Sequence, residues 1–261
     1  MHEFQEKAVV LETKELSRNV VRLRVRSTGI ASEARPGQFV MVRIGSSSTP
    51  LLRRPFSIHK VKKNSLSLLY KVVGQGTEQL RRTAPGEELD LLGPLGRGFP
   101  LPGKGEKICL VGGGMGIAPL TFLAQRIAAM KRDFSSDRVL LGAATASELQ
   151  PLVRDFSALG FQVKEATDDG SLGYKGVVTA LLPPLLSDCQ RIYVCGPHTM
   201  MAAAAGLCHT AGVTCLVSLE THMACGLGAC LGCTIFASDG SYRHVCKNGP
   251  VFNAKEVAWM L

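Results

Sequence analysis

Hydrophobic and polar residues alternate through most of the first hundred positions. The clearest case is residues 21–26, where Val and Leu alternate with Arg, so that an extended chain has one apolar face and one charged face. Shorter segments of this kind are separated by turns rich in Gly, Pro and Ser, and they lie at residues 38–44, 56–62, 66–73 and 87–92. Many short strands at regular spacing predict a small antiparallel β-barrel.

The pattern changes after residues 100–106, a linker rich in Pro, Gly and Lys. Residues 107–111 are a short apolar run, typical of a strand buried on both faces, and a glycine-rich loop and an apolar helix to about Lys131 follow. Further apolar runs alternate with helical segments, at residues 139–141, 161–165 and 191–194, before an Ala-rich helix at 201–209. This alternation predicts a doubly wound α/β domain.

A chain of 261 residues is long enough for two such cores and a small appendage. We therefore expect a multidomain protein with a barrel at residues 1–101, the α/β domain at 102–214 and a small cysteine-rich domain at 215–261.

The chain has 30 Lys and Arg against 21 Asp and Glu, a formal charge of +9. These cations are dispersed, without interleaved aromatic residues or a recognised motif, so nucleic acid is not an expected partner. No run of about 18 apolar residues is free of charge, so no membrane span is expected. Nine cysteines, in a chain without a recognisable signal peptide, suit a reducing cytoplasm.

Four of these cysteines lie close together near the C-terminus: Cys225, Cys230, Cys233 and Cys246. The first three have the C-x4-C-x2-C spacing of plant-type [2Fe-2S] sites, and the glycines between them let the backbone wrap round a compact cofactor. Structural zinc remains an alternative, although it usually requires two short pairs separated by a longer spacer. A disulfide framework fits a long chain of this kind poorly.

A cation, a rigid turn, an aromatic ring and a hydroxyl follow one another in Arg54, Pro55, Phe56 and Ser57. The planar guanidinium of Arg54 suits a diphosphate, but an ordinary basic turn leading into a strand is the alternative. A second anion site is expected where a strand passes through glycines into a short helix, at Gly76 and Thr77. Thr77 is alternatively a helix N-cap.

The α/β domain has two candidate nucleotide-binding segments at the ends of predicted strands. The first is a loop between strand and helix, which contains Gly112, Gly113, Gly114 and Gly116. The second follows the last strand, with Cys195, Gly196 and Pro197. Because ligands of open α/β sheets bind beyond the carboxyl ends of the strands, both segments are expected to face one crevice that binds a dinucleotide. Cys195 is alternatively a small buried apolar residue.

Several of these motifs resemble those of the ferredoxin reductase superfamily. Residues 54–57 resemble its R-x-[YF]-[ST] flavin motif, and Gly76 with Thr77 resembles its second FAD-diphosphate motif. The resemblance implies that Arg54 and Thr77 contact the diphosphate of FAD and that Phe56 and Ser57 approach the flavin, and Lys71 is added to this set. The C-G-P-x-x-M motif at residues 195–200 implies a catalytic Cys195 beside the nicotinamide and the flavin.

The resemblance also bears on the choice of nicotinamide cofactor. Superfamily members that prefer NADPH tend to carry Ser-Arg after the third strand of this domain, whereas this chain carries Asp168 and Asp169. A carboxylate repels a 2′-phosphate and accepts hydrogen bonds from ribose hydroxyls, so NAD is the expected cofactor. Both residues are alternatively turn residues before Gly170.

Taken together, the three domains are similar in order to the electron-transfer subunits of class 1B dihydroorotate dehydrogenases. The most specific segments are residues 112–120, 167–179, 219–233 and 245–252, and one departure is Thr221-His222 where the family usually carries Arg before Met. This resemblance implies a cytoplasmic heterotetramer, two of each chain, in pyrimidine biosynthesis. An FMN-containing catalytic subunit would pass electrons through [2Fe-2S] and FAD to NAD+.

Two other functions stay open from the sequence. One is the flavin and iron–sulfur subunit of an NAD(P)H:ferredoxin oxidoreductase or a cytoplasmic hydrogenase. The other is a zinc-stapled NAD-binding regulator, which leaves residues 54–57 unexplained. For the redox functions, the apolar loop around Leu227 and Leu231 is the expected contact surface for a partner.

Overall fold

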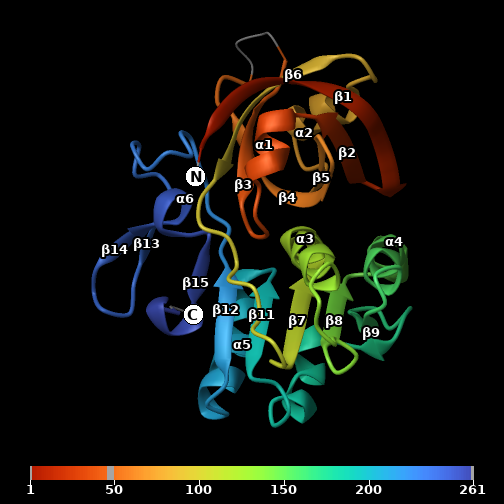
Figure 1. Ribbon diagram of the computed structural model, residues 1–261, viewed down its shortest axis with the longest axis vertical. Helices are drawn as coiled ribbons and strands as arrows, with labels where there is room; N and C mark the ends of the chain where they lie inside the picture. Colours follow the sequence, from red (N-terminus) through yellow and green to blue (C-terminus); the bar gives the residue numbers. More distant parts are fainter. Residues whose placement is uncertain (1, 46–49, 260–261) are drawn as a thin grey trace.

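The alternating residues of the first hundred positions form a closed antiparallel barrel (Figure 1). In the computed structural model, which describes residues 2–45 and 50–259, its strand order is β1-β2-β5-β4-β3-β6, and β1 pairs with β6 to close it. The strands are β1 (Phe4–Ser17), β2 (Val20–Arg26), β3 (Phe39–Arg43), β4 (Arg54–Lys62), β5 (Ser65–Lys71) and β6 (Glu88–Leu95). Two helices accompany them, α1 (Thr28–Glu33) and α2 (Gln75–Arg81).

Strand β2 illustrates why the barrel forms. Val21, Leu23 and Val25 are fully buried inside it, whereas Arg22 and Arg24 between them lie at the partly exposed outer face. This period of two buries one face of each strand and hydrates the other. The predicted antiparallel barrel is therefore confirmed.

The second half of the chain forms a seven-stranded sheet of order β10-β9-β8-β7-β11-β12-β15. Its strands are β7 (Ile108–Gly113), β8 (Arg138–Ala143), β9 (Gln162–Thr167), β10 (Tyr174–Lys175), β11 (Arg191–Cys195), β12 (Thr214–Ser218) and β15 (Val251–Asn253). All pairs are parallel except β12 with β15. The helices are α3 (Ile117–Ala128), α4 (Ala146–Ser157) and α5 (His198–Thr210), with 3-10 turns η1 (Gly114–Gly116), η2 (Val178–Leu181) and η3 (Pro183–Leu185). The predicted doubly wound domain is confirmed.

Two helix boundaries differ from those expected from the sequence. Helix α3 ends at Ala128 rather than near Lys131. Helix α5 begins at His198, three residues before the expected start, because the carbonyl of Pro197 accepts the backbone N–H of Met201 at 3.0 Å. The expected helix began instead at the alanine run, where helix propensity rises.

The cysteine-rich segment is built around a small hairpin, β13 (Thr234–Phe236) with β14 (Tyr242–His244), followed by α6 (Val245–Asn248) and η4 (Ala254–Glu256). It is joined to the α/β domain because β15 adds antiparallel to β12 at the sheet edge. The expected division at residues 101 and 214 stays a prediction, and its limits at 1 and 261 lie outside the described residues. We propose to move the second division beyond Ser218, since β12 pairs with β11 along its length.

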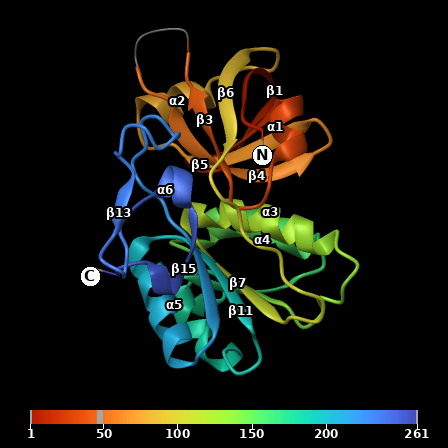
Figure 2. The same cartoon turned by 60° about the vertical axis from the view of Figure 1, so that its left-hand side comes forward.

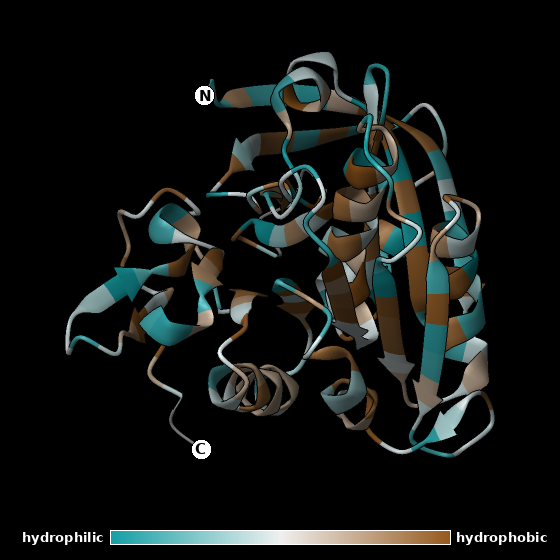
Figure 3. Ribbon diagram, turned by 60° about the horizontal axis from the view of Figure 1, so that its bottom comes forward, coloured by the Kyte–Doolittle hydropathy of each residue, from teal (hydrophilic) through white to brown (hydrophobic). Residues whose placement is uncertain are grey.

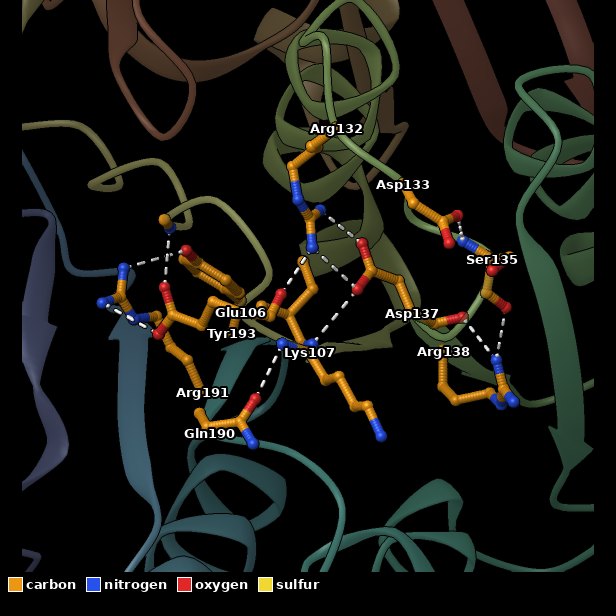
Figure 4. Close-up of polar contacts among 12 residues, drawn as sticks. Glu106, Lys107, Arg132, Asp133, Ser135, Asp137, Arg138, Gln190, Arg191 and Tyr193 are labelled. Carbon is orange, nitrogen blue, oxygen red and sulfur yellow. Dashed lines mark hydrogen bonds and ion pairs between the residues drawn. The ribbon is translucent and has the colours of Figure 1, made fainter.

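Polar contacts fasten the linker between the barrel and the sheet (Figure 4). Arg191 forms an ion pair with Glu106 at 3.0 Å, and Arg132, in a buried ion pair with Asp137 at 2.6 Å, also donates to the carbonyl of Glu106. The hydroxyl of Tyr193 donates to the carbonyl of Pro100 at 2.9 Å. These contacts hold the chain that leaves the barrel against the α/β domain.

Helices α3 and α4 lie between the sheet and the barrel (Figures 1 and 2). Asp155 of α4 forms ion pairs with two barrel residues, Lys60 at 2.6 Å and Arg22 at 3.6 Å, and a hydrogen bond with a third, His59, at 3.2 Å. Hydrophobic residues run along the central strands and the helices packed on them (Figure 3). No helix in the described ranges is long and apolar enough to cross a membrane.

Candidate functional site

A cavity of about 630 Å³ lies where the barrel, the α/β domain and the cysteine-rich segment meet. All seven residues expected to bind FAD line it: Arg54, Pro55, Phe56, Ser57, Lys71, Gly76 and Thr77. The opposite walls come from Met115 and Ala118 of the α/β domain and from residues 218–221 and 223. The structure thus brings the two predicted motifs together, and their binding of FAD stays a prediction.

Three of these residues have defined partners. Thr77 is the third residue of α2 and not its N-cap, which is Gly74; its hydroxyl accepts the N–H groups of Val73 and Gly74 at 2.9 and 3.2 Å. Arg54 donates to the carbonyl of Leu52 at 2.9 Å. The ammonium of Lys71 pairs with Glu148 of α4 at 2.8 Å, so Lys71 joins the two domains at the edge of the cavity.

Two hydroxyl groups in the cavity wall fit a bound cofactor. The buried oxygens of Tyr70 and Thr221 have no hydrogen-bond partner among the described residues. Burial raises the pKa of Tyr70, whose ring packs against Phe56 with 5.3 Å between centroids. A buried hydroxyl without a partner costs about 1–3 kcal/mol, so a polar ligand that satisfies both stabilises the fold. FAD, with its ribityl chain, diphosphate and polar ring edge, fits this requirement.

A second cavity, of about 460 Å³, lies at the carboxyl ends of the parallel strands. Four residues expected to bind the dinucleotide line it: Gly113, Gly114, Asp168 and Pro197. The others do not. Gly112 is buried in β7, and Gly116 packs so closely on Cys195 that a Cβ would lie 2.4 Å from its carbonyl carbon.

Cys195, the predicted catalytic residue, lies in neither cavity. Its side chain is buried, and its thiol donates to the carbonyl of Ser218 at 3.4 Å. Burial raises its pKa, and the carboxylate of Glu220 adds to this effect. Gly116 packs against the backbone of Cys195 and Gly196, and the role of Cys195 in catalysis stays a prediction.

The two aspartates after β9 have different surroundings. Asp168 lines the dinucleotide cavity. Asp169 accepts the N–H and the hydroxyl of Ser171 at 2.9 and 2.6 Å, and these hydrogen bonds lower its pKa. Asp169 therefore has the contacts of a turn residue, whereas Asp168 lines the cavity and its contact with a ribose stays a prediction.

The four clustered cysteines form two pairs. The sulfurs of Cys233 and Cys246 lie 3.2 Å apart and are buried, and Cys225 forms a hydrogen bond with the more exposed Cys230. Within residues 2–45 and 50–259, no three His, Cys, Asp or Glu side chains converge as a single metal ion requires. Four thiolates in two pairs match a two-iron cluster better than one tetrahedral zinc.

Backbone groups prepare the first pair for metal. Cys225 accepts the N–H groups of Leu227 and Cys230, each at 3.4 Å, and Gly226, with φ of 74°, lets the chain turn around it. Burial raises the pKa of Cys225, but these N–H donors outweigh it and lower the pKa to about 6. In the second pair, burial and the neighbouring Cys233 raise the pKa of Cys246 to about 12. Metal binding displaces such protons, so the residues fit an iron–sulfur cluster.

A short segment joins the two sites. Glu220, Thr221 and Met223 line the FAD cavity, and Cys225 is the first cluster cysteine. An adjoining cavity of about 670 Å³ lies between this segment and Leu52, and His222 lines it. The barrel, the sheet and this adjacent cysteine loop define the class of the protein, a ferredoxin reductase-like flavoprotein with an iron–sulfur domain.

Comparisons with known proteins make the class more specific. The profile of the family described as "Iron-sulfur cluster binding domain of dihydroorotate dehydrogenase B" matches residues 220–258, and that of "Oxidoreductase FAD-binding domain" matches residues 7–99. The "Dihydroorotate dehydrogenase B (NAD(+)), electron transfer subunit" of Desulforamulus reducens is 42% identical over 97% of both chains. The protein of that name from Caldanaerobacter subterraneus is 37% identical over 96% of this chain and 97% of its own. The chain belongs to this family of electron transfer subunits.

Solved structures agree on the fold. The NADH-dependent reduced ferredoxin-NADP oxidoreductase, studied for flavin-based electron bifurcation, superimposes with a TM-score of 0.85 at 29% identity, covering 97% of this chain and 90% of that one. The ferredoxin reductase of carbazole 1,9a-dioxygenase superimposes with a TM-score of 0.68 at 22% identity, covering 82% and 67%. The second likeness concerns the fold alone.

Proposed function

We propose that this chain is the electron-transfer subunit of an NAD-dependent dihydroorotate dehydrogenase of pyrimidine biosynthesis. The observation that carries the proposal is the single segment, residues 220–225, that lines the FAD cavity at one end and supplies a cluster cysteine at the other. Electron transfer requires short distances between cofactors, and a segment of six residues that reaches from one site to the other keeps them close. Full-length identity of 42% to a named electron transfer subunit supports the same function.

Each cofactor has its own set of residues. FAD would be held by Arg54, Pro55, Phe56, Ser57, Lys71, Gly76 and Thr77. NAD would be held by Gly113, Gly114, Asp168 and Pro197, with Gly112, Gly116, Asp169, Gly196 and Cys195 supporting the loops around them. The cluster would be [2Fe-2S], held by Cys225, Cys230, Cys233 and Cys246. When bound, the cluster carries single electrons and FAD exchanges them with NAD as hydride.

The partner is a catalytic subunit that contains FMN and oxidises dihydroorotate, in a cytoplasmic heterotetramer of two of each chain. Leu227 and Leu231 of the cluster loop are 48% and 57% exposed. Leu51 and Leu52 of the barrel are exposed as well, and Leu52 lines the adjoining cavity together with Gly232 of the cluster loop. These leucines support a docking surface that spans both cofactor sites, as apolar patches of interfaces do.

A visible spectrum of anaerobically purified protein, before and after NADH, tests the proposal. Flavin and iron–sulfur bands that bleach with NADH are expected, with about two irons per chain and no zinc. Addition of a dihydroorotate-oxidising FMN subunit should then couple dihydroorotate to NAD+ reduction. A colourless, zinc-containing protein would contradict the redox function and favour the nucleotide-binding regulator.

One other candidate function has a specific observation in its favour. The likeness to the NADH-dependent reduced ferredoxin-NADP oxidoreductase covers 97% of this chain. A ferredoxin-linked or hydrogenase-linked subunit would bleach with NADH in the same way, so the spectrum does not separate the two. Steady reduction of ferredoxin by NADH, without coupling to the FMN subunit, would favour this second function.

A further inference from the structure

Lys247 lies across the loop that carries the first two cluster cysteines. It follows Cys246 directly in α6, and its side chain is exposed. A Cβ built on Gly228 would lie 2.9 Å from Cδ of Lys247 and 3.3 Å from its Cβ, so the aliphatic stem rests flat on this glycine. Gly228 also has φ of 79°, a conformation that favours glycine. The stem therefore packs on a glycine that lies between Cys225 and Cys230 in the sequence, and Lys247 itself directly follows Cys246.

The ammonium group of Lys247 is not neutralised by a neighbour. Within residues 2–45 and 50–259, no carboxylate lies within ion-pair distance of it. Arg243, another cation of this domain, is paired with Asp239 at 2.9 Å. Residues 221–238 contain no Asp or Glu. Lys247 therefore adds a net positive charge at the edge of the cluster loop.

We propose that Lys247 raises the reduction potential of the cluster, an inference that rests on the proposed function. Four thiolates make an iron–sulfur site anionic, and reduction adds one more negative charge. A fixed cation beside it stabilises the reduced state more than the oxidised state. Because Lys247 is exposed, salt screens this interaction. The effect is a bias on how readily the cluster accepts an electron, set by a residue that does not ligate iron.

Potentiometric titration of the full-length holoprotein, monitored by EPR, tests this role. Lys247→Met keeps an apolar stem over Gly228 and removes the charge, so the midpoint potential should fall. Lys247→Glu should lower it further, and Lys247→Arg should restore the wild-type value. The matched control is Lys255→Met, an exposed lysine in η4 of the same domain. The shift should shrink between low and high salt, where the Debye length decreases from roughly 30 Å to 3 Å.

Unchanged potentials in Lys247→Met and Lys247→Glu would overturn the proposal. Equal shifts in Lys247→Met and Lys255→Met, or a shift independent of salt, would also overturn it, since either would point to general charge or to altered packing. Iron and sulfide analysis of each variant keeps the two proposals apart. Wild-type protein without iron and sulfide would contradict the proposed function itself, whereas a loaded cluster with an unmoved potential would contradict only the role of Lys247.

Discussion

Thr221 sits in the wall of the FAD cavity with a buried hydroxyl oxygen that has no partner among the described residues. We expect this hydroxyl to bind a polar atom of FAD. Thr221→Val keeps the shape of the side chain and removes the hydroxyl, so FAD affinity should fall by about 2- to 13-fold, the contribution of one hydrogen bond of roughly 0.5–1.5 kcal/mol. Fluorescence titration of FAD into the FAD-stripped chain measures this change.

Thr221→Ser serves as the control, because it retains a hydroxyl and should bind FAD nearly as well as the wild-type chain. The melting temperature without FAD gives an independent readout. If Thr221→Val stabilises the FAD-free chain and leaves FAD affinity unchanged, the hydroxyl of Thr221 destabilises the fold by its burial and does not bind FAD.

Asp168 governs the preference between NAD and NADP in our interpretation. It lines the dinucleotide cavity, and its carboxylate would repel a 2′-phosphate. Asp168→Ser should raise the NADPH-to-NADH ratio of kcat/KM by about tenfold, equivalent to roughly 1.4 kcal/mol. Asp169→Ser is the control, since Asp169 is engaged with Ser171 and should change the ratio little. An equal change in both variants would show that the turn matters and the charge does not.

Residue motifs predicted the candidate sites wherever the chemistry lies in one short stretch. The cluster cysteines and the residues from Arg54 to Ser57 are examples, and the structure brings each set together. The sequence did not point to Tyr70, Met115 or Thr221, because these residues reach the FAD cavity from separate elements. The hydroxyls of Tyr70 and Thr221 become candidate ligands only once the structure shows that they are buried without a hydrogen-bond partner among the described residues.

At the scale of elements, the ion pairs between β4 and α4 make the contact between domains dependent on pH. Burial lowers the pKa of His59 from 6.5, against the opposing effect of Asp155 and aided by Lys60 and Arg22. His59 therefore takes up a proton at a higher pH in the unfolded chain than in the folded chain. The contribution of neutral His59 to the free energy of unfolding is complete above pH 6.5 and is lost as the pH falls below it. Burial also acts to raise the pKa of Asp155, but His59 and Lys60 outweigh it and lower it to about 2.

The carboxylate of Asp155 thus keeps its contribution above its ordinary pKa of 3.8 and loses it only as the pH falls toward about 2. Between pH 7 and 5, His59 lowers stability as the pH falls, whereas Asp155 stays ionised. His59→Gln cannot take up a proton, so its melting temperature should fall less between pH 7 and 5 than that of the wild-type chain. The exposed His209→Gln should keep the wild-type slope. Equal slopes for both variants would contradict the assignment to His59.

Elements with strong periodicity were predicted well, and those defined by distant contacts were not. Strands of the barrel and of the parallel sheet lie close to their expected ranges, because alternation and short apolar runs report burial directly. Strand β15 was not expected, since its three residues become a strand only by pairing with β12. Helix α1, six residues long, also lacks a repeating apolar face that sequence could reveal.

At the scale of the whole molecule, the three candidate sites are neighbours in space, with the FAD cavity between the dinucleotide cavity and the cluster cysteines. The Gly114–Gly116 turn borders both cavities, with Gly114 in the wall of the dinucleotide cavity and Met115 in the wall of the FAD cavity, and residues 220–225 join the FAD cavity to the cluster cysteines. The order of sites in space could be expected from the family resemblance alone. The physical connections between them depend on close packing, such as Gly116 on Cys195, which periodicity does not describe.

The cluster cysteines lie on an exposed loop, so a substitution on this loop should weaken partner binding without affecting NADH oxidation. Leu227 lies on the cluster loop, 48% exposed, and its side chain takes no part in the FAD or dinucleotide cavity. A charge placed in an apolar interface must be desolvated on docking, so Leu227→Asp should weaken binding of the catalytic subunit at least about fivefold, or roughly 1 kcal/mol. Sedimentation or titration calorimetry measures the binding.

Reduction of an artificial acceptor by NADH should meanwhile stay at the wild-type rate in Leu227→Asp, because FAD and NAD bind elsewhere. Leu101→Asp, a similar change at an exposed leucine of the linker, is the control and should leave both partner binding and NADH oxidation unchanged. Loss of both activities in Leu227→Asp, together with loss of iron, would mean that Leu227 shapes the cluster loop rather than the docking surface. Retention of full partner binding would place the interface on another face of the molecule.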